Sequence, residues 1–323
     1  AALAEAPDAC GVFLVEPSFV GVLSDVGAIA ELAHGAGVPL VVDQAWGAHF
    51  GFHPAVPPHA LASGADAFVA SSHKTLAAFT QSAFLLARGG LLDLERLDES
   101  FEILHTTSVS AALLASIDRA RMIMATRGEE LLGETVRLAA YARGRLAEVE
   151  GLAIVPSDDP TKLALALPGT GVDGLDVEAD LFAQGIRFEL ANRDLLVPLL
   201  TIADTEDGVE RLCDALVASL AGRRGESRPP GAASAVWDIT PETAMTPREA
   251  FFSARETVGA EDAPGRVAAE MVCPYPPGIP AIAPGEVVSR ELVEALREAA
   301  AAGTRLSYCA DAALASLQVV ARA

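Results

Sequence analysis

Lysine is scarce in this sequence of 323 residues. Only Lys74 and Lys162 are lysines among the 23 basic residues, and all the others are arginines. A partly desolvated lysine can lose its proton near neutral pH and attack a carbonyl group, whereas arginine stays protonated. We therefore expect a lysine in this chain to do something that arginine cannot do. The six histidines all lie in the first third of the chain, which also contains Lys74.

Other absences exclude several classes of protein. Four cysteines without a C-x-x-C spacing argue against a zinc site and a disulfide framework, and we expect no bound metal. A net charge of -21 without an arginine-rich stripe argues against binding to nucleic acid. The mean hydropathy is +0.34, but apolar runs end far short of the roughly 20 residues that cross a bilayer. Residues 1–9 lack the basic and apolar regions of a secretory signal, so we expect a cytoplasmic protein.

The first part of the chain alternates short apolar runs with helical patterns. This order is typical of an α/β fold with a mainly parallel sheet that is covered by helices on both faces. Strands are predicted at residues 12–16, 38–43, 66–71 and 82–87. Helices are predicted at residues 24–37, with Ser24 or Asp25 as N-cap, at 91–97, and at 110–149 with an interruption near 126–128.

The composition predicts four parts along the chain. They are a large domain with its bridging helix at residues 1–150, a small α/β domain at 151–222, a linker at 223–245 and a C-terminal domain at 246–323. The linker is predicted because its first residues are rich in Gly, Pro, Ser and charge. Further strands are predicted around residues 152–156, 162–168 and 186–190, and further helices at 172–184, at 207–220, from Thr246 and at 289–302.

Two groups with complementary chemistry follow neighbouring predicted strands. Asp43 ends the strand 38–43, and Lys74 comes just after the strand 66–71. Ligands of open α/β sheets bind beyond the carboxyl ends of the strands. An Asp–Lys pair at such a place is more often a salt bridge. It is also what pyridoxal phosphate requires, because a lysine forms the Schiff base and an aspartate keeps the ring nitrogen protonated.

The sequence around this pair resembles the Orn/Lys/Arg decarboxylases, the bacterial type of basic amino-acid decarboxylase. The resemblance covers residues 15–76, which contain DQAWGAH and SSHKTL, and continues at 104–121, which contain HTTSVSAALLASIDRAR. A third match is PGRVAAEMVCPYPPGIPAIAPGE at residues 264–286, and the three matches follow the family's order. The resemblance implies a pyridoxal-phosphate enzyme of fold type I, like aspartate aminotransferase.

The resemblance implies a role for each matching residue. Lys74 would form the Schiff base, Asp43 would hold the pyridine nitrogen, Ala45 would lie against the ring face and Ser71 would contact the phosphate. His73 would contact the cofactor and, with Lys74, handle a proton. The family further implies at least a homodimer with shared sites, in which the cofactor phosphate is approached by three residues of the neighbouring subunit: Thr106, Thr107 and Ser108.

The sequence departs from the family pattern at three positions, where Gln44 replaces Glu, Trp46 replaces His and Val109 replaces Pro. These departures bear on the substrate more than on the cofactor. We expect substrate contacts from Trp46, His49 and Glu286, although these residues could also be a core aromatic, a loop histidine and part of a rigid turn. Lys162, in DPTKLALAL, also resembles a family segment, but a surface lysine at a strand edge explains it equally well.

We predict the decarboxylation of a basic amino acid, which is lysine, ornithine or arginine, to the corresponding amine. Two alternatives stay open. The same cofactor and the same two residues serve aminotransferases and other fold-type-I enzymes. The chain could also be a catalytically inactive decarboxylase-like fragment or paralogue, because the family's earlier part of the large domain, with its phosphate-cradling turn, has no match here.

Overall fold

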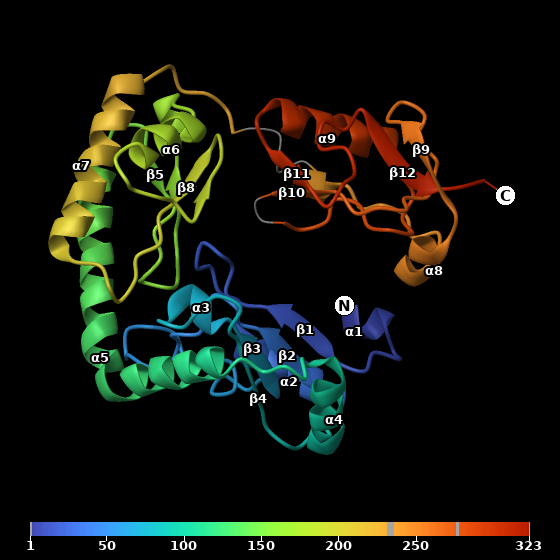
Figure 1. Ribbon diagram of the computed structural model, residues 1–323, viewed down its shortest axis with the longest axis horizontal. Coiled ribbons are helices and arrows are strands. Elements are labelled where there is room, and N and C mark those ends of the chain that lie inside the picture. Colours follow the sequence, from blue (N-terminus) through green and yellow to red (C-terminus); the bar gives the residue numbers. More distant parts are fainter. Residues whose placement is uncertain (1, 231–235, 276–277, 323) are drawn as a thin grey trace. The chain divides into compact units, whose positions relative to one another are not determined.

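The computed structural model describes residues 2–230, 236–275 and 278–322 (Figure 1). The chain forms two compact units that are interleaved in the sequence. The first unit contains residues 1–149, 154–164 and 198–215, and the second contains 150–153, 165–197 and 216–323. No helix in the described part of the chain is both long and apolar enough to cross a membrane.

A four-stranded sheet forms the centre of the first unit. β1 (Val12–Val15), β2 (Leu40–Asp43) and β3 (Ala67–Ala70) are parallel neighbours in that order, as the sequence predicted. β4 (Phe84–Ala87) pairs with β3 in the antiparallel direction, which the sequence did not predict. Parallel strands need a crossover, and the connection between β3 and β4 holds only the single helical turn α3 (Ser72–Thr75).

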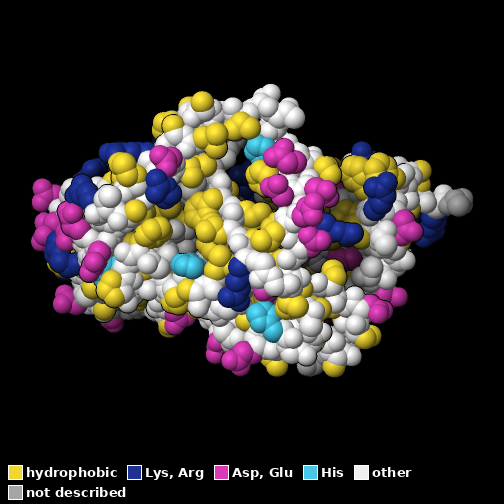
Figure 2. Space-filling view, turned by 90° about the horizontal axis from the view of Figure 1, so that it is seen from below, with side chains coloured by type: hydrophobic (Ala, Val, Ile, Leu, Met, Phe, Trp, Pro, Cys, Tyr) yellow, Lys and Arg dark blue, Asp and Glu magenta, His cyan; other side chains and the backbone are white. Residues whose placement is uncertain are grey.

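Helix α2 (Val26–Gly35) connects β1 to β2 and covers one face of this sheet. It begins as predicted, because the Asp25 side chain accepts a hydrogen bond from the Ala28 amide at 2.9 Å. Phe13 and Val15 alternate with the core-facing positions of β1 and are 68% and 62% exposed. Figure 2 likewise shows hydrophobic side chains reaching the surface in many places on the face that it displays.

Helix α5 (Ala111–Ala147) is continuous, so the predicted interruption near residues 126–128 is wrong. Figure 1 shows that α5 bends instead of breaking. The Thr126 hydroxyl donates to the Met122 carbonyl oxygen at 2.7 Å, a bond that is often found where helices bend. Gly128 lies inside the helix at a point where Phe52 comes close. A Cβ atom on Gly128 would lie 3.2 Å from the Cβ atom of Phe52. Helix α4 (Leu94–Leu104) precedes α5 in the sequence, and α7 (Glu206–Arg223) follows the second sheet.

A second four-stranded sheet has the strand order β5-β6-β8-β7. β8 pairs in the antiparallel direction with both β6 and β7. The predicted strand 186–190 is misplaced, because the observed strand β7 starts only at residue 190. The strand β8 was not predicted. The bounds are Ala153–Ile154 for β5, Leu165–Ala166 for β6, Leu190–Ala191 for β7, Leu195–Val197 for β8 and Gly174–Phe182 for the predicted helix α6.

The end of the chain forms a separate hydrophobic core in the second unit. Helix α9 (Arg290–Ala301) buries Leu292 and Leu296 in this core, and Ser289 caps its first turn. Helix α8 (Pro247–Phe252) starts with a capping box formed by Thr246 and Glu249. Two antiparallel pairs complete this part: β9 (Arg255–Gly259) with β12 (Ser316–Val320), and β10 (Cys273–Tyr275) with β11 (Arg305–Ser307).

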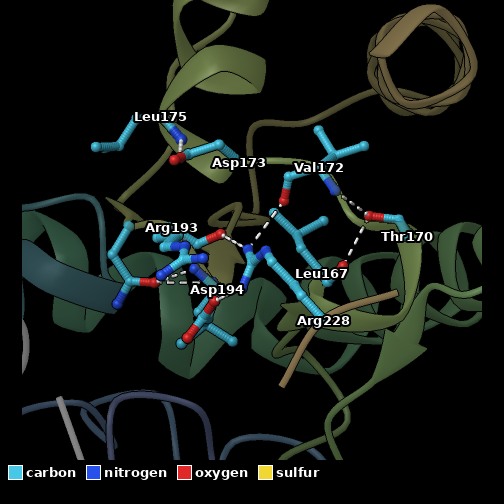
Figure 3. Close-up of polar contacts among 10 residues, drawn as sticks. Leu167, Thr170, Val172, Asp173, Leu175, Arg193, Asp194 and Arg228 are labelled. Atoms are coloured by element: carbon cyan, nitrogen blue, oxygen red, sulfur yellow. Dashed lines mark hydrogen bonds and ion pairs between the residues drawn. The ribbon is translucent and has the colours of Figure 1, made fainter. Parts of the chain in front are cut away.

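Arg228 fixes the start of the predicted linker to the second unit (Figure 3). Its guanidinium group donates to the Asp194 carboxylate. It also donates to the carbonyl oxygen of Val172 at 3.0 Å and to that of Arg193 at 2.7 Å. Only 15% of the Arg228 side chain and 25% of the Asp194 side chain are exposed. Residues 231–235 of the predicted linker lie outside the described residues.

Replacing Arg228 by alanine should destabilise the second unit, because Asp194 would lose the guanidinium group beside it. We expect the free energy of unfolding, measured in urea by circular dichroism, to fall by roughly 2 kcal/mol, less than for a fully buried pair. The matched control is Arg224→Ala, which breaks the exposed pair with Glu150 and should cost under about 0.5 kcal/mol. Equal losses in the two variants would contradict this account of Arg228.

Candidate functional site

Asp43 and Lys74 lie at adjoining strand ends in the first unit. Asp43 is the last residue of β2 and is in register with Val15 of β1 and Val69 of β3. Lys74 lies in α3, the single turn that follows β3. Because β2 and β3 are parallel neighbours, both groups lie at the carboxyl edge of the sheet, where open α/β sheets bind ligands.

Asp43 and Lys74 do not form a salt bridge with each other. In the described part of the chain, the Oδ1 atom of Asp43 accepts a hydrogen bond from the Ala45 amide at 3.0 Å. Lys74 instead places its ammonium group 4.7 Å from the centre of the Trp46 ring. The carboxylate and the amine are therefore both available to a third group.

Trp46 contacts both lysines of the chain. The ammonium nitrogen of Lys162 lies 4.6 Å from the centre of the same ring, within the range of a cation–π interaction. Only 3% of Lys162 is exposed, so its interpretation as a surface lysine at a strand edge is wrong. This contact could not be predicted from the sequence, because residues 46 and 162 are far apart along the chain. The scarcity of lysine was the signal that Lys162 could have a special role.

A buried polar cluster lies next to Lys162. The Nε2 atom of His49 is 3.0 Å from Asp159 Oδ2 and 3.3 Å from Thr161 Oγ1, and His49 and Asp159 are almost fully buried. Thr161 also donates to Asp159 Oδ1 through both its hydroxyl and its amide. Burial alone would raise the pKa of Asp159, but His49, Lys162 and Thr161 together hold this pKa below its usual value. Asp159 is therefore a carboxylate at neutral pH.

The backbone of Gly21 holds this turn in place. Its carbonyl oxygen accepts hydrogen bonds from the amides of Asp158 and Asp159 and from the Ser157 hydroxyl. Gly21 has a φ of +86°, and a Cβ atom on it would lie 2.2 Å from Ser157 Oγ and 2.7 Å from Lys162 Cγ. A glycine is thus required both by the backbone conformation and by the close approach of Lys162.

His73 is fixed by the turn between β3 and β4. Its Nδ1 atom lies 2.7 Å from the carbonyl oxygen of Ser82. Because a carbonyl oxygen only accepts, Nδ1 carries the proton, and Nε2 of the neutral ring is the acceptor. Ser71 precedes α3 as its N-cap, yet within the described chain its hydroxyl makes no capping hydrogen bond.

Two further groups of predicted site residues come from other parts of the chain. The segment Thr106, Thr107 and Ser108 is exposed between α4 and α5. Glu286 belongs to the second unit, where its Oε2 atom accepts a hydrogen bond from the Ala283 amide at 2.7 Å. Gln44 is only 1% exposed and accepts a hydrogen bond from the Ala60 amide, so this departure from the family pattern concerns loop packing.

The donor groups at this edge fit pyridoxal phosphate. An amine for the aldehyde, a carboxylate for the ring nitrogen and a serine hydroxyl for the phosphate come from the loops after β2 and β3. The described residues contain no group of three or more His, Cys, Asp and Glu side chains that could hold a metal ion.

Several known decarboxylases have sequences similar to this chain. Residues 1–158 match the family model described as Orn/Lys/Arg decarboxylase, major domain, and residues 231–306 match the model of its C-terminal domain. The chain is 36% identical over 330 residues to an arginine decarboxylase of Bacillus subtilis (strain 168), covering 99% of this chain and 67% of that protein. The chain belongs to the Orn/Lys/Arg decarboxylase family.

Solved structures show the fold of this Orn/Lys/Arg decarboxylase family member. The constitutive lysine decarboxylase of E. coli has a TM-score of 0.78 at 20% identity, and the match covers 97% of this chain and 58% of that chain. An ureidoglycine-glyoxylate aminotransferase of Bacillus subtilis has a TM-score of 0.54 at 18% identity, covering 69% and 62%. The predicted fold class, that of fold-type-I enzymes, is confirmed. The chain spans about two thirds of its arginine decarboxylase relative and less than that of these solved chains.

Gly21→Ala should displace the turn that carries Lys162. Gly37→Ala is the matched control, because Gly37 also has a positive φ, of +76°, but nothing lies within 4 Å of its Cβ position. Both variants strain the backbone, and only Gly21→Ala adds a clash, for which we expect a further loss of roughly 1–3 kcal/mol. Unfolding of the two variants in urea measures the difference, and equal losses would mean that the close approach at Gly21 is unimportant.

Asp159→Asn should destabilise this decarboxylase-family chain in a pH-dependent way. Because the folded pKa of Asp159 is lowered, the stability that its charge contributes is present above the unfolded value of about 3.9. That contribution is lost as the pH falls through the lower folded pKa. We expect a deficit of roughly 2 kcal/mol at neutral pH that shrinks in acid, measured by urea unfolding across pH. Asp98→Asn, on exposed α4, serves as control, and a deficit that is constant with pH would argue against this role.

Proposed function

We propose that this chain supplies the lysine-bearing part of a pyridoxal-phosphate-dependent decarboxylase that acts on a basic amino acid. The observation that carries the proposal is the pair of Asp43 and Lys74, which lie at adjoining strand ends without bonding to each other. Family membership supports decarboxylation. Arginine is the substrate that we favour, because the relative that is 36% identical over nearly the whole chain is an arginine decarboxylase.

In this proposal each residue at the sheet edge has a defined task. Lys74 attaches the cofactor through its Nζ atom, and Asp43 holds a proton at the ring nitrogen. When bound, the cofactor withdraws electrons from the substrate's α-carbon, which allows carbon dioxide to leave. Ala45 provides a small side chain beside the ring, and Ser71 donates its hydroxyl to the phosphate.

Proton handling falls to Lys74 and His73. The bond from His73 Nδ1 to the Ser82 carbonyl oxygen sets the ring orientation and leaves Nε2 to accept or deliver a proton. The ammonium group of Lys74 lies 4.7 Å from the centre of the Trp46 ring, so the indole is beside the amine.

The other predicted residues complete the proposal. Thr106, Thr107 and Ser108 lie in an exposed segment, as a role in the site of a neighbouring subunit requires, so we propose at least a homodimer. Glu286 would receive the cationic end of the substrate. His49 is bonded to Asp159 and Thr161, which favours support of the site over direct contact with substrate.

An aminotransferase is the alternative that the structure supports, because an aminotransferase shares this fold. The complete protein should be incubated with arginine and with lysine, and the carbon dioxide, amine and keto acid should be measured. Decarboxylation predicts one amine for each carbon dioxide and no keto acid. Formation of keto acid without carbon dioxide would favour the aminotransferase, and failure to bind pyridoxal phosphate would favour an inactive paralogue.

Lys74→Arg separates the chemistry of Lys74 from its charge. Arginine keeps a cation beside Trp46 but cannot act as an amine nucleophile. We expect the complete protein to lose its cofactor–lysine absorption band, with kcat reduced by about 10³-fold or more. Arg127→Lys, an exposed position on α5, is the control and should leave both unchanged. Activity near that of the unmodified protein in Lys74→Arg would contradict the assignment.

A further inference from the structure

We infer that Lys162 is a positioning residue that holds the Trp46 ring against Lys74. This inference rests on the proposed function, because it concerns the same site. The two ammonium nitrogens lie 4.7 and 4.6 Å from the centre of one indole ring. Trp46 is thus the physical link between the lysine that follows β3 and a lysine in the turn before β6.

The burial of Lys162 indicates a specific need for a cation at this place. Lys162 is 3% exposed, and removing an ammonium group from water is costly unless nearby groups compensate. Asp159 is such a group, since Lys162 contributes to the attraction that stabilises its negative charge. An apolar side chain would avoid the cost of burial, and the contacts of the buried charge include the face of Trp46 as well as the attraction to Asp159.

The surroundings also explain why this residue is lysine in a chain that otherwise uses arginine. The stem of Lys162 passes Gly21 so closely that a Cβ atom there would lie 2.7 Å from its Cγ atom. The neighbouring cavity, lined in part by His49, Thr75 and Thr161, has a volume of about 10 Å³ and could hold one water molecule at most. A narrow stem with a compact ammonium group fits this space, whereas the planar fork of a guanidinium group does not.

The backbone around Lys162 is held from two sides, so that the side chain starts from a fixed point. Its amide donates to the Asp159 carbonyl oxygen at 3.1 Å, and the amides of Asp158 and Asp159 donate to Gly21. From α5, the guanidinium group of Arg143 donates to the carbonyl oxygens of Pro160, at 2.9 Å, and Lys162. A turn fixed in this way can set the position of the Trp46 ring, and through the ring the position of the Lys74 amine.

The test uses Lys162→Met, which keeps the length of the stem and removes the charge. The first readout is acrylamide quenching of Trp46 fluorescence in the cofactor-free protein. The Trp46 signal is obtained as the difference between each protein and its Trp46→Phe counterpart, because Trp237 also emits. We expect the quenching constant of Trp46 to rise at least twofold, since a ring without its cation moves more freely. Arg127→Met, at an exposed position of α5, should leave the constant unchanged.

The second readout is made on the complete protein with pyridoxal phosphate. We expect Lys162→Met to lower kcat by about 10-fold or more with a smaller change in KM, because a displaced amine reacts less well while substrate binding persists. If Lys162→Met does not fold, Lys162→Arg keeps the charge and should also raise the quenching of Trp46, because its fork does not fit beside Gly21.

Quenching that stays within 1.5-fold, in whichever of these variants folds, would overturn the positioning role of Lys162. The proposed function could still stand in that case, because it depends on Lys74 rather than on Lys162. Conversely, an active Lys74→Arg protein would refute the proposed function, while the quenching experiment would still test the contact between Lys162 and Trp46, since it needs no cofactor.

Discussion

Trp46 lies beside the ammonium groups of both lysines of the chain, and in our account this contact positions the site. Trp46 follows β2 and Lys74 follows β3, so the parallel pairing of these strands brings the ring to the first lysine. The second lysine arrives from a turn that Gly21 and Arg143 hold by hydrogen bonds. The surroundings of the Lys74 amine therefore include residues from both the sheet edge and this turn.

Buried polar side chains lie on one side of this ring. Lys162, Asp159 and His49 are all buried, and each reduces the cost of burying the others. Such a cluster adds little net stability compared with well-packed apolar side chains, and its specific contacts are the bonds of Thr161 to Asp159 and the approach of His49 to both. In the first unit, Asp43 and Lys74 do not form a salt bridge with each other, which suits residues that bind a ligand. The first unit thus combines a rigid polar support with reactive groups that are still available.

The sequence predicted those features that depend on neighbouring residues. Apolar runs and caps placed β1 to β3 and α2 correctly, and the strand ends placed Asp43 and Lys74 at one edge. The direction of β4 depends on packing of the connection after β3, and Gly128 of the continuous helix α5 packs against Phe52, which is far away in the sequence. The burial of Lys162 depends on residues 21 and 46, which no local pattern connects with it. Long-range contacts of this kind produce no periodic pattern in the sequence. The use of lysine at position 162, in a chain that otherwise uses arginine, was the only local sign of such a contact.

The central claim is that Lys74, and not Lys162, carries the cofactor. Because these are the only two lysines in the chain, reductive trapping gives a direct answer. The complete protein with pyridoxal phosphate should be treated with borohydride, digested and analysed by mass spectrometry. The account predicts a pyridoxyl group on the peptide that contains Lys74 and none on the peptide that contains Lys162. A pyridoxyl group on Lys162, or unmodified Lys74 in a protein that has bound the cofactor, would contradict it.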